Sequence, residues 1–206
     1  MGRSPLSPLR TAAPILVLDG DGHGERLPPC TRVSVVRAGG GGMTVLAFDA
    51  AKRRTGYAFS TTDGWITGVV DVADTKALAA IIEAAKATGV TRAVIENCYM
   101  SSNVRTLKAL QEAQTRIRVA CEMAGLGVEL VYAQTWQSAY GISGQRKDRK
   151  LGAKRIASML GAGNVSEDEA DAVCLCDYAE RVGLQEELAL SGKRGKARRH
   201  DGRMGL

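Results

Sequence analysis

Two short apolar segments of this chain each end at an acidic residue. Thr44 to Phe48 is β-prone, almost wholly apolar and followed directly by Asp49, and Thr91 to Ile95 repeats the pattern before Glu96. A strand that is apolar at nearly every position is typical of burial on both faces of a sheet. Open sheets bind ligands at the carboxyl ends of such strands. The pattern therefore predicts two acids at a functional edge, although a turn Asp and a polar strand terminator would each explain one acid alone.

The remaining segments predict a mixed sheet with helices on its faces. Two strands at 55–60 and 65–70 are separated by turn residues, and a fifth strand is expected at 128–132. Apolar periodicity and capping residues predict helices at 76–86, 102–124, 146–160 and 166–182. The order βββαβαβαα, with crossovers between parallel strands, indicates an α/β fold.

The ends of the chain differ in character from its middle. Residues 1–42 carry all five prolines and close in a glycine run, so we expect a disordered leader and linker, with Met43 as an alternative translation start. The folded domain is expected at 43–185, followed by a disordered basic tail at 186–206. Segment 192–206 alone holds six Lys and Arg residues against one Asp, within a chain of net charge +6. Such a tail favours a salt-sensitive contact with a polyanion, and a solvated tail that aids solubility is the alternative.

The cysteine and histidine content and the hydropathy exclude several classes of protein. The five cysteines are odd in number and irregularly spaced, which argues against a disulfide framework. The only histidines, His23 and His200, lie in the tails, so zinc binding and histidine-based catalysis are not expected. The apolar stretch from Ala12 to Leu18 is too short to span a membrane. We expect a soluble cytoplasmic protein without a membrane partner.

The segment from 166 to 182 adds a second pair of acids. Ser166-Glu-Asp-Glu169 is a capping box, which accounts for acids in the first turn without any function. Asp171 lies past that turn, between two alanines, and its neighbours one and two turns on are Cys174, Leu175 and Tyr178. A carboxylate on an apolar face needs a partner. Asp168 lies three residues earlier on the same side, so the two acids can share a metal ion.

These acids together predict a site for hard divalent cations. Carboxylate oxygens are the ligands that Mg²⁺ prefers, and two such ions activate water and stabilise the leaving oxygen in phosphodiester hydrolysis. The predicted ligands are Asp49, Glu96, Asp168 and Asp171, with two Mg²⁺ per site and Mn²⁺ as a substitute. In the basic stretch 146–150, Lys147 and Lys150 could offset phosphate charge or orient the water. A solvated helix face is the alternative, and we favour it more for Lys150 than for Lys147.

Several ordered motifs resemble those of RuvC-type Holliday junction resolvases. They span residues 44–182 and are Leu46-Ala-Phe-Asp49, Thr55-Gly-Tyr57, Ile95-Glu96 with Tyr99-Met100 and Asn103, and Asp168-Glu-Ala-Asp171-Ala. The resemblance implies an RNase H-like fold with a mixed five-stranded sheet, in which the four matching acids bind two divalent metals. It also implies that Lys147, which follows the shared Gly141-Ile142, is a catalytic lysine near the active site.

The resemblance extends to DNA and to a second subunit. It implies that Tyr99 stacks on a base near the junction centre, while ordinary packing is the alternative. It implies a homodimer through the helix at 102–124, whose apolar stripe comprises Leu107, Leu110, Ile117, Ala120 and Met123. Contacts with DNA are expected from Tyr99, Asn103, Arg105, Arg146, Lys147 and Lys150.

The sequence also departs from the family pattern. A second lysine of bacterial members would fall near Trp136, and no Lys stands between Val128 and Gln145. The leader and the basic tail have no counterpart in the family. These departures are typical of a divergent member, and a phage origin is one interpretation.

The leading hypothesis is a metal-dependent endonuclease that resolves Holliday junctions or branched DNA by paired symmetric cuts. The nearest alternative is a nuclease of the same fold that processes ribosomal RNA precursor. A non-catalytic junction-binding protein is a further alternative, which the presence of all four acids disfavours. An actin-like ATPase or sugar kinase would need a second large domain, and 206 residues are too few for one.

Overall fold

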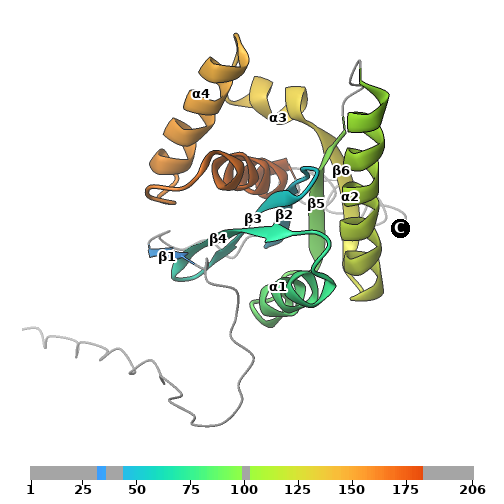
Figure 1. Cartoon of the computed structure of the whole chain (residues 1–206). Coiled ribbons are helices and arrows are strands. Elements are labelled where there is room, and N and C mark those ends of the chain that lie inside the picture. The colour runs from blue at the N-terminus through green and yellow to red at the C-terminus, as the bar shows by residue number, and fades with distance from the viewer. Residues whose placement is uncertain (1–31, 36–43, 99–102, 183–206) are drawn as a thin grey trace, which may run out of the picture.

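The computed structural model describes residues 32–35, 44–98 and 103–182 (Figure 1). Its sheet is six-stranded, in the order β1-β4-β3-β2-β5-β6. The strands are β1 (Arg32–Val35), β2 (Val45–Asp49), β3 (Arg54–Thr61), β4 (Gly64–Asp71), β5 (Arg92–Asn97) and β6 (Gly127–Tyr132). β2, β3 and β4 pair antiparallel, whereas β5 pairs parallel with both β2 and β6. The central strand β2 is buried at all five positions, as its continuous apolar sequence predicted.

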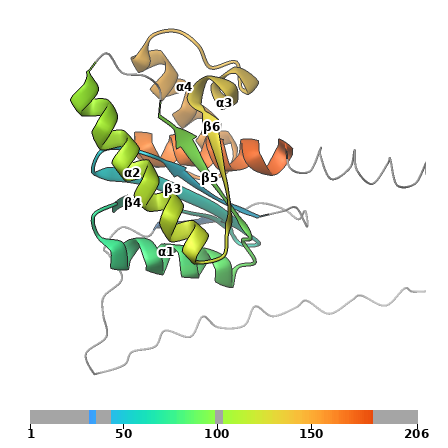
Figure 2. The ribbon, with the colours of Figure 1, turned by 90° about the vertical axis from the view of Figure 1, so that its right-hand side faces the viewer.

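Helices cover both faces of the sheet, as two views at right angles show (Figures 1 and 2). They are α1 (Thr75–Ala87), α2 (Val104–Met123), α3 (Ala133–Ala139), α4 (Arg146–Met159) and a helix over residues 167–182, here called the final helix. One core cluster joins Leu46 and Phe48 to α1 and α2, and the other joins Val45 and Ala47 to α3, α4 and the final helix. Alternate residues of β2 therefore enter opposite cores.

The predicted α/β fold with five strands and four long helices is confirmed, with two additions. Residues 32–35 of the expected leader form β1, paired antiparallel with β4, while the rest of that leader and the predicted tail at 186–206 lie outside the described residues. The short helix α3 was not predicted, because Trp136 is the one large apolar residue among its seven positions. In the predicted apolar stripe of α2, Ile117 is fully buried in the core and Met123 is 84% exposed. Within the described residues, no helix is both long and apolar enough to cross a membrane.

Candidate active site

The two strand-end acids lie side by side at one edge of the sheet. Asp49 is the last residue of β2, and Glu96 lies one residue before the end of the neighbouring parallel strand β5. Ala47 and Val94 belong to the core cluster under the final helix. Because side chains alternate along a strand, Asp49 and Glu96 face this same helical layer.

The second pair of acids opens the final helix. The predicted capping box is confirmed, since the backbone N–H of Ser166 donates to Glu169 Oε2 (2.9 Å) and that of Glu169 donates to Ser166 Oγ (3.3 Å). Thr67 on β4 also donates to Glu169, at 3.0 Å, which ties the start of the helix to the sheet. Asp168 is partly exposed and Asp171, one turn later, is buried.

Gly56 allows the final helix to come close to the sheet. It lies on β3 as the register partner of Asp49, and a Cβ atom at this position would overlap the backbone carbonyl of Asp168. A backbone carbonyl, unlike a flexible side chain, cannot move away without shifting the helix. The Thr55-Gly-Tyr57 motif therefore fixes the distance between the strand-end acid and the helix acids.

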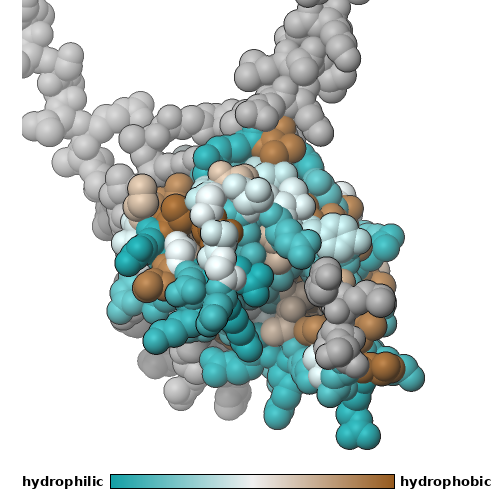
Figure 3. All heavy atoms as spheres, turned by 90° about the horizontal axis from the view of Figure 1, so that it is seen from above, coloured by the Kyte–Doolittle hydropathy of each residue, from teal (hydrophilic) through white to brown (hydrophobic). Residues whose placement is uncertain are grey.

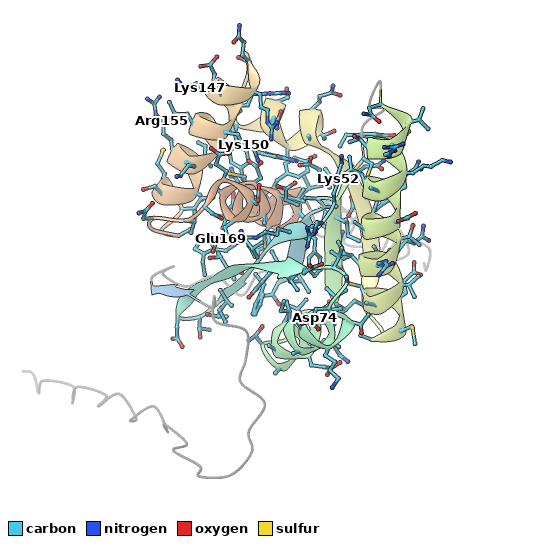
Figure 4. All side chains as sticks on the ribbon, in the orientation of Figure 1. Lys52, Asp74, Lys147, Lys150, Arg155 and Glu169 are labelled. Carbon is cyan, nitrogen blue, oxygen red and sulfur yellow. The ribbon has the colours of Figure 1, made fainter. Side chains whose placement is uncertain are left out.

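Lys150, rather than Lys147, reaches the acids. Its Nζ contacts Asp171 Oδ2 directly and lies 3.6 Å from Asp168 Oδ1 and 4.0 Å from Asp49 Oδ2. The expectation that Lys150 belongs to a solvated helix face is wrong, since its side chain is only 18% exposed. Lys147 lies on the outer side of α4 (Figure 4) and is exposed. The two lysines are three residues apart, and only the way α4 packs decides which faces inward.

The acids repel one another in this partly buried site. Burial raises the pKa of Asp49 well above its ordinary value, and the charges of Glu96 and Asp171 raise it further. Burial, followed by the charge of Asp171, raises the pKa of Glu96 to about 7. Burial also raises the pKa of Asp171, although Lys150 opposes the shift. One ammonium therefore does not balance the negative charge of the cluster.

These shifts predict how the metal-free protein responds to pH. Glu96 has an ordinary pKa of 4.5 when unfolded and about 7 when folded, so between these values the folded state holds more protons. Stability is then lost as the pH rises through this range. In EDTA, we expect a melting temperature several degrees lower at pH 8 than at pH 5.5, and a smaller drop for Glu96→Gln. Thermal melts across this range measure it, and a melting temperature that rises with pH would contradict the prediction.

Trp136, which sequence reasoning did not select, holds Glu96. Its indole Nε1–H donates to Glu96 Oε2 at 3.1 Å, and the side chain is fully buried. At the end of α3, the Tyr140 hydroxyl contacts Asp177 of the final helix at 2.5 Å, and Arg181 lies over the Tyr140 ring. The one sequence signal for Trp136 was a large apolar residue in a polar segment, near the position where the resemblance to RuvC-type resolvases implies a lysine.

Replacing Trp136 with Phe removes this donor and keeps most of the packing. Loss of a hydrogen bond that orients a metal ligand lowers activity roughly 10- to 100-fold, and for the nuclease activity proposed below we expect single-turnover cleavage of a four-way DNA junction to fall within that range. Trp65→Phe is the matched control, because Trp65 is equally buried and its indole donates to the carbonyl of Leu160 (2.8 Å) instead of an acid. Equal losses of cleavage in both variants would show that Trp136 contributes only packing.

Three of the four acids line a cavity of about 410 Å³. Its lining joins strand ends to α3 and α4 and comprises Asp49, Glu96, Tyr132, Ala133, Gln134, Gln137, Arg146, Arg149, Lys150 and Asp171. A second, adjoining hollow of about 610 Å³ lies along α4 and is lined by Arg146, Lys147, Asp148, Lys150, Leu151, Lys154 and Glu167. We call this second hollow the α4 groove. Arg146 and Lys150 line both, so the acid cavity continues into a basic surface.

The other predicted DNA contacts are distributed around this edge. Tyr99 lies outside the described residues. Asn103 caps α2, because its side chain accepts from the backbone N–H of Thr106 at 3.2 Å, and Arg105 is exposed in the first turn. Lys52, which follows β2, donates to the Thr106 hydroxyl at 2.9 Å and lies beside α2 (Figure 4).

The donor chemistry of the acid cluster fits a divalent cation, although the side chains are not arranged as a ready-made site. In the ranges 44–98 and 103–182, no three His, Cys, Asp or Glu side chains form a group that would hold a metal ion. The ammonium of Lys150 instead lies among three of the four carboxylates. All four donors are hard oxygen ligands, and three have raised pKa values from crowding and burial. Added positive charge would relieve that repulsion.

The mixed sheet, with acids at the ends of neighbouring strands and on the final helix, defines an RNase H-like α/β fold. Among solved structures, the chain is similar to T. thermophilus RuvC in complex with a Holliday junction substrate, with a TM-score of 0.51 at 14% identity over 65% of this chain and 90% of that one. A second Thermus thermophilus RuvC structure matches with a TM-score of 0.51 at 15% identity, covering 65% and 91% of the two chains. No protein-family model and no curated protein matches the sequence. The predicted fold, that of RuvC-type resolvases, is confirmed.

Proposed function

We propose that this chain is a divalent-metal-dependent endonuclease that cuts four-way or branched DNA at paired, symmetric positions. The observation that carries the proposal is the meeting of two pairs of acids: Asp49 and Glu96, at the carboxyl ends of the parallel strands β2 and β5, and Asp168 and Asp171, on the final helix. The RuvC-like fold and the basic α4 groove beside these acids support it.

Each side chain of the site then has a chemical role. The four carboxylates would hold two Mg²⁺, with Mn²⁺ as a substitute, and such ions would supply positive charge for activating a water and stabilising the leaving oxygen. Arg146 and Arg149 line the cavity and balance charge on the scissile phosphate. Trp136 keeps the Glu96 carboxylate in position through its indole N–H.

DNA would be held by basic surfaces on both sides of the acids. One is the α4 groove, with Arg146, Lys147 and Lys154. The other is formed by Lys52 and Arg105, next to the start of α2. Seen from above, hydrophilic residues cover most of the coloured surface, with hydrophobic patches among them (Figure 3). Phosphate contacts of this kind give affinity without reading sequence, so we expect recognition of the branched shape.

A homodimer would supply the second cut. A four-way junction has approximate two-fold symmetry, which a two-fold dimer of active sites matches. The supporting observation is exposed apolar area on α2 and β6, from Val104, Val119, Met123, Leu130 and Tyr132. Sedimentation analysis should give twice the chain mass of 21.8 kDa.

The test of the proposed function is cleavage of a synthetic four-way junction in Mg²⁺, with linear duplex and structured RNA of matched length as controls. Symmetric nicks in the junction alone, absent in EDTA and in Asp49→Asn, are the expected result. Cleavage of the RNA instead would favour the ribosomal RNA processing alternative. Tight junction binding without any cutting would leave a non-catalytic binding protein.

A further inference from the structure

Lys150 occupies an unusual position for a residue expected to contact DNA. Its ammonium lies among the carboxylates of Asp49 on β2 and of Asp168 and Asp171 on the final helix, with Nζ–O distances of up to 4.0 Å. A lysine whose role was only to hold DNA would extend into the α4 groove. Here its charged end is directed to the acids.

We propose that Lys150 is a built-in counter-ion, which holds the acid cluster together in the metal-free protein and is displaced toward the α4 groove when divalent cations bind. This inference rests on the metal site of the proposed function. It adds that the chain itself competes with the metal, so that metal affinity is set by Lys150 as well as by the ligands.

The competition follows from the atoms involved. Asp49 Oδ2, Asp168 Oδ1 and Asp171 Oδ2 are the oxygens nearest to the ammonium. A divalent cation binds carboxylate oxygens at about 2.1 Å, closer than an ammonium approaches them. Two cationic groups among the same oxygens would repel each other strongly in a site of reduced dielectric. Occupation by one therefore weakens occupation by the other.

The displaced side chain has a place to go. Lys150 lines both the acid cavity and the α4 groove, so rotation of its flexible four-carbon stem can move the ammonium between them. Glu167 lines the α4 groove and offers a carboxylate there. An ammonium in this groove would lie where the proposed function puts the DNA backbone, so metal loading would also prepare the phosphate site.

The test measures binding of Mn²⁺ by titration calorimetry, without DNA, to the whole chain and to Lys150→Met. We expect Mn²⁺ to bind Lys150→Met roughly tenfold more tightly, which corresponds to about 1.4 kcal/mol. In EDTA the same variant should melt at a lower temperature than the wild type, because its acids have lost their counter-ion. Lys150→Arg keeps the charge and should bind Mn²⁺ within about twofold of the wild type, a difference well under 1 kcal/mol.

Lys154→Met is the matched control, since Lys154 lies one turn further along α4 and lines the α4 groove but not the acid cavity. It removes the same charge from the protein and should leave Mn²⁺ affinity close to that of the wild type. Unchanged or weaker Mn²⁺ binding in Lys150→Met, or an equal gain in Lys154→Met, would overturn the inference. Absence of Mn²⁺ binding in every form would overturn it together with the metal-dependent nuclease. Tighter binding in Lys150→Met with no junction cleavage by the wild type would support the counter-ion and reject the proposed function.

Discussion

Asp49→Asn is expected to abolish cleavage of a four-way junction while leaving junction binding nearly intact. Asp49 is the strand-end acid at the centre of the cluster, flanked by Glu96 and Asp171 and reached by Lys150. Asparagine keeps the shape but removes the charge that would hold a cation. The rate should fall at least roughly a thousandfold, the scale seen when a member of a catalytic group is removed. Single-turnover cleavage in Mg²⁺ measures the rate, and a gel-shift titration in Ca²⁺ measures binding.

Metal binding and DNA binding are assigned to separate surfaces of the protein. Affinity for DNA should come from the basic surfaces, so the dissociation constant of Asp49→Asn should stay within about threefold of the wild type. Asp63→Asn is the matched control, because Asp63 is exposed in the turn between β3 and β4. Loss of binding in Asp49→Asn as large as the loss of cleavage would contradict the assignment of separate metal and DNA surfaces.

Gly56→Ala is expected to damage both the fold and the site by adding a single methyl group. The new Cβ would overlap the carbonyl of Asp168, so the final helix must move away from β3. Overpacking of this kind lowers the free energy of unfolding by about 1–3 kcal/mol or more, and the rigid backbone neighbour favours the upper end. Because the shift separates Asp168 and Asp171 from Asp49, cleavage should fall by roughly a hundredfold even where the protein remains folded. Urea unfolding and single-turnover cleavage measure the two effects.

Gly127→Ala controls for the loss of a strand glycine. Gly127 begins β6, and the nearest atom to an added Cβ is the side-chain Cγ of Arg92 at 3.9 Å, an ordinary contact. This variant should cleave at the wild-type rate and be no less stable. If Gly56→Ala behaved in the same way, the close approach of the final helix to β3 would not be a constraint on the site.

Much of the fold was predictable because local patterns and burial agree. β2 is apolar at every position before Asp49 since it enters a different core on each face. α1 begins after Asp74, which caps it, and ends before Gly89, which adopts a positive φ of 92°. The capping box of the final helix was equally predictable from the sequence, because its hydrogen bonds join residues that are three positions apart.

The elements missed from the sequence depend on distant partners. β1 is a strand because its backbone pairs with β4, which lies about 30 residues further along the chain. Local sequence patterns do not predict such a pairing. The structure of α3 depends on Trp136, which packs against α4 and donates a hydrogen bond to Glu96, 40 residues earlier in the chain. Short helices gain little from propensity alone, so tertiary contacts decide whether they form.

By itself, the sequence determined the α/β fold and which four carboxylates could act together, because strand burial and helix periodicity are local consequences of residue type. Only the tertiary structure decided the position of each charge relative to the others. Lys147 and Lys150 belong to the same basic stretch, yet the packing of α4 turns only Lys150 toward the acids. Likewise, Gly56 belongs to a motif that the sequence shows, but only the structure shows that the carbonyl of Asp168 packs against it. The electrostatic energy of a site depends on burial and on distances between segments far apart in the chain, and local sequence patterns do not reveal these.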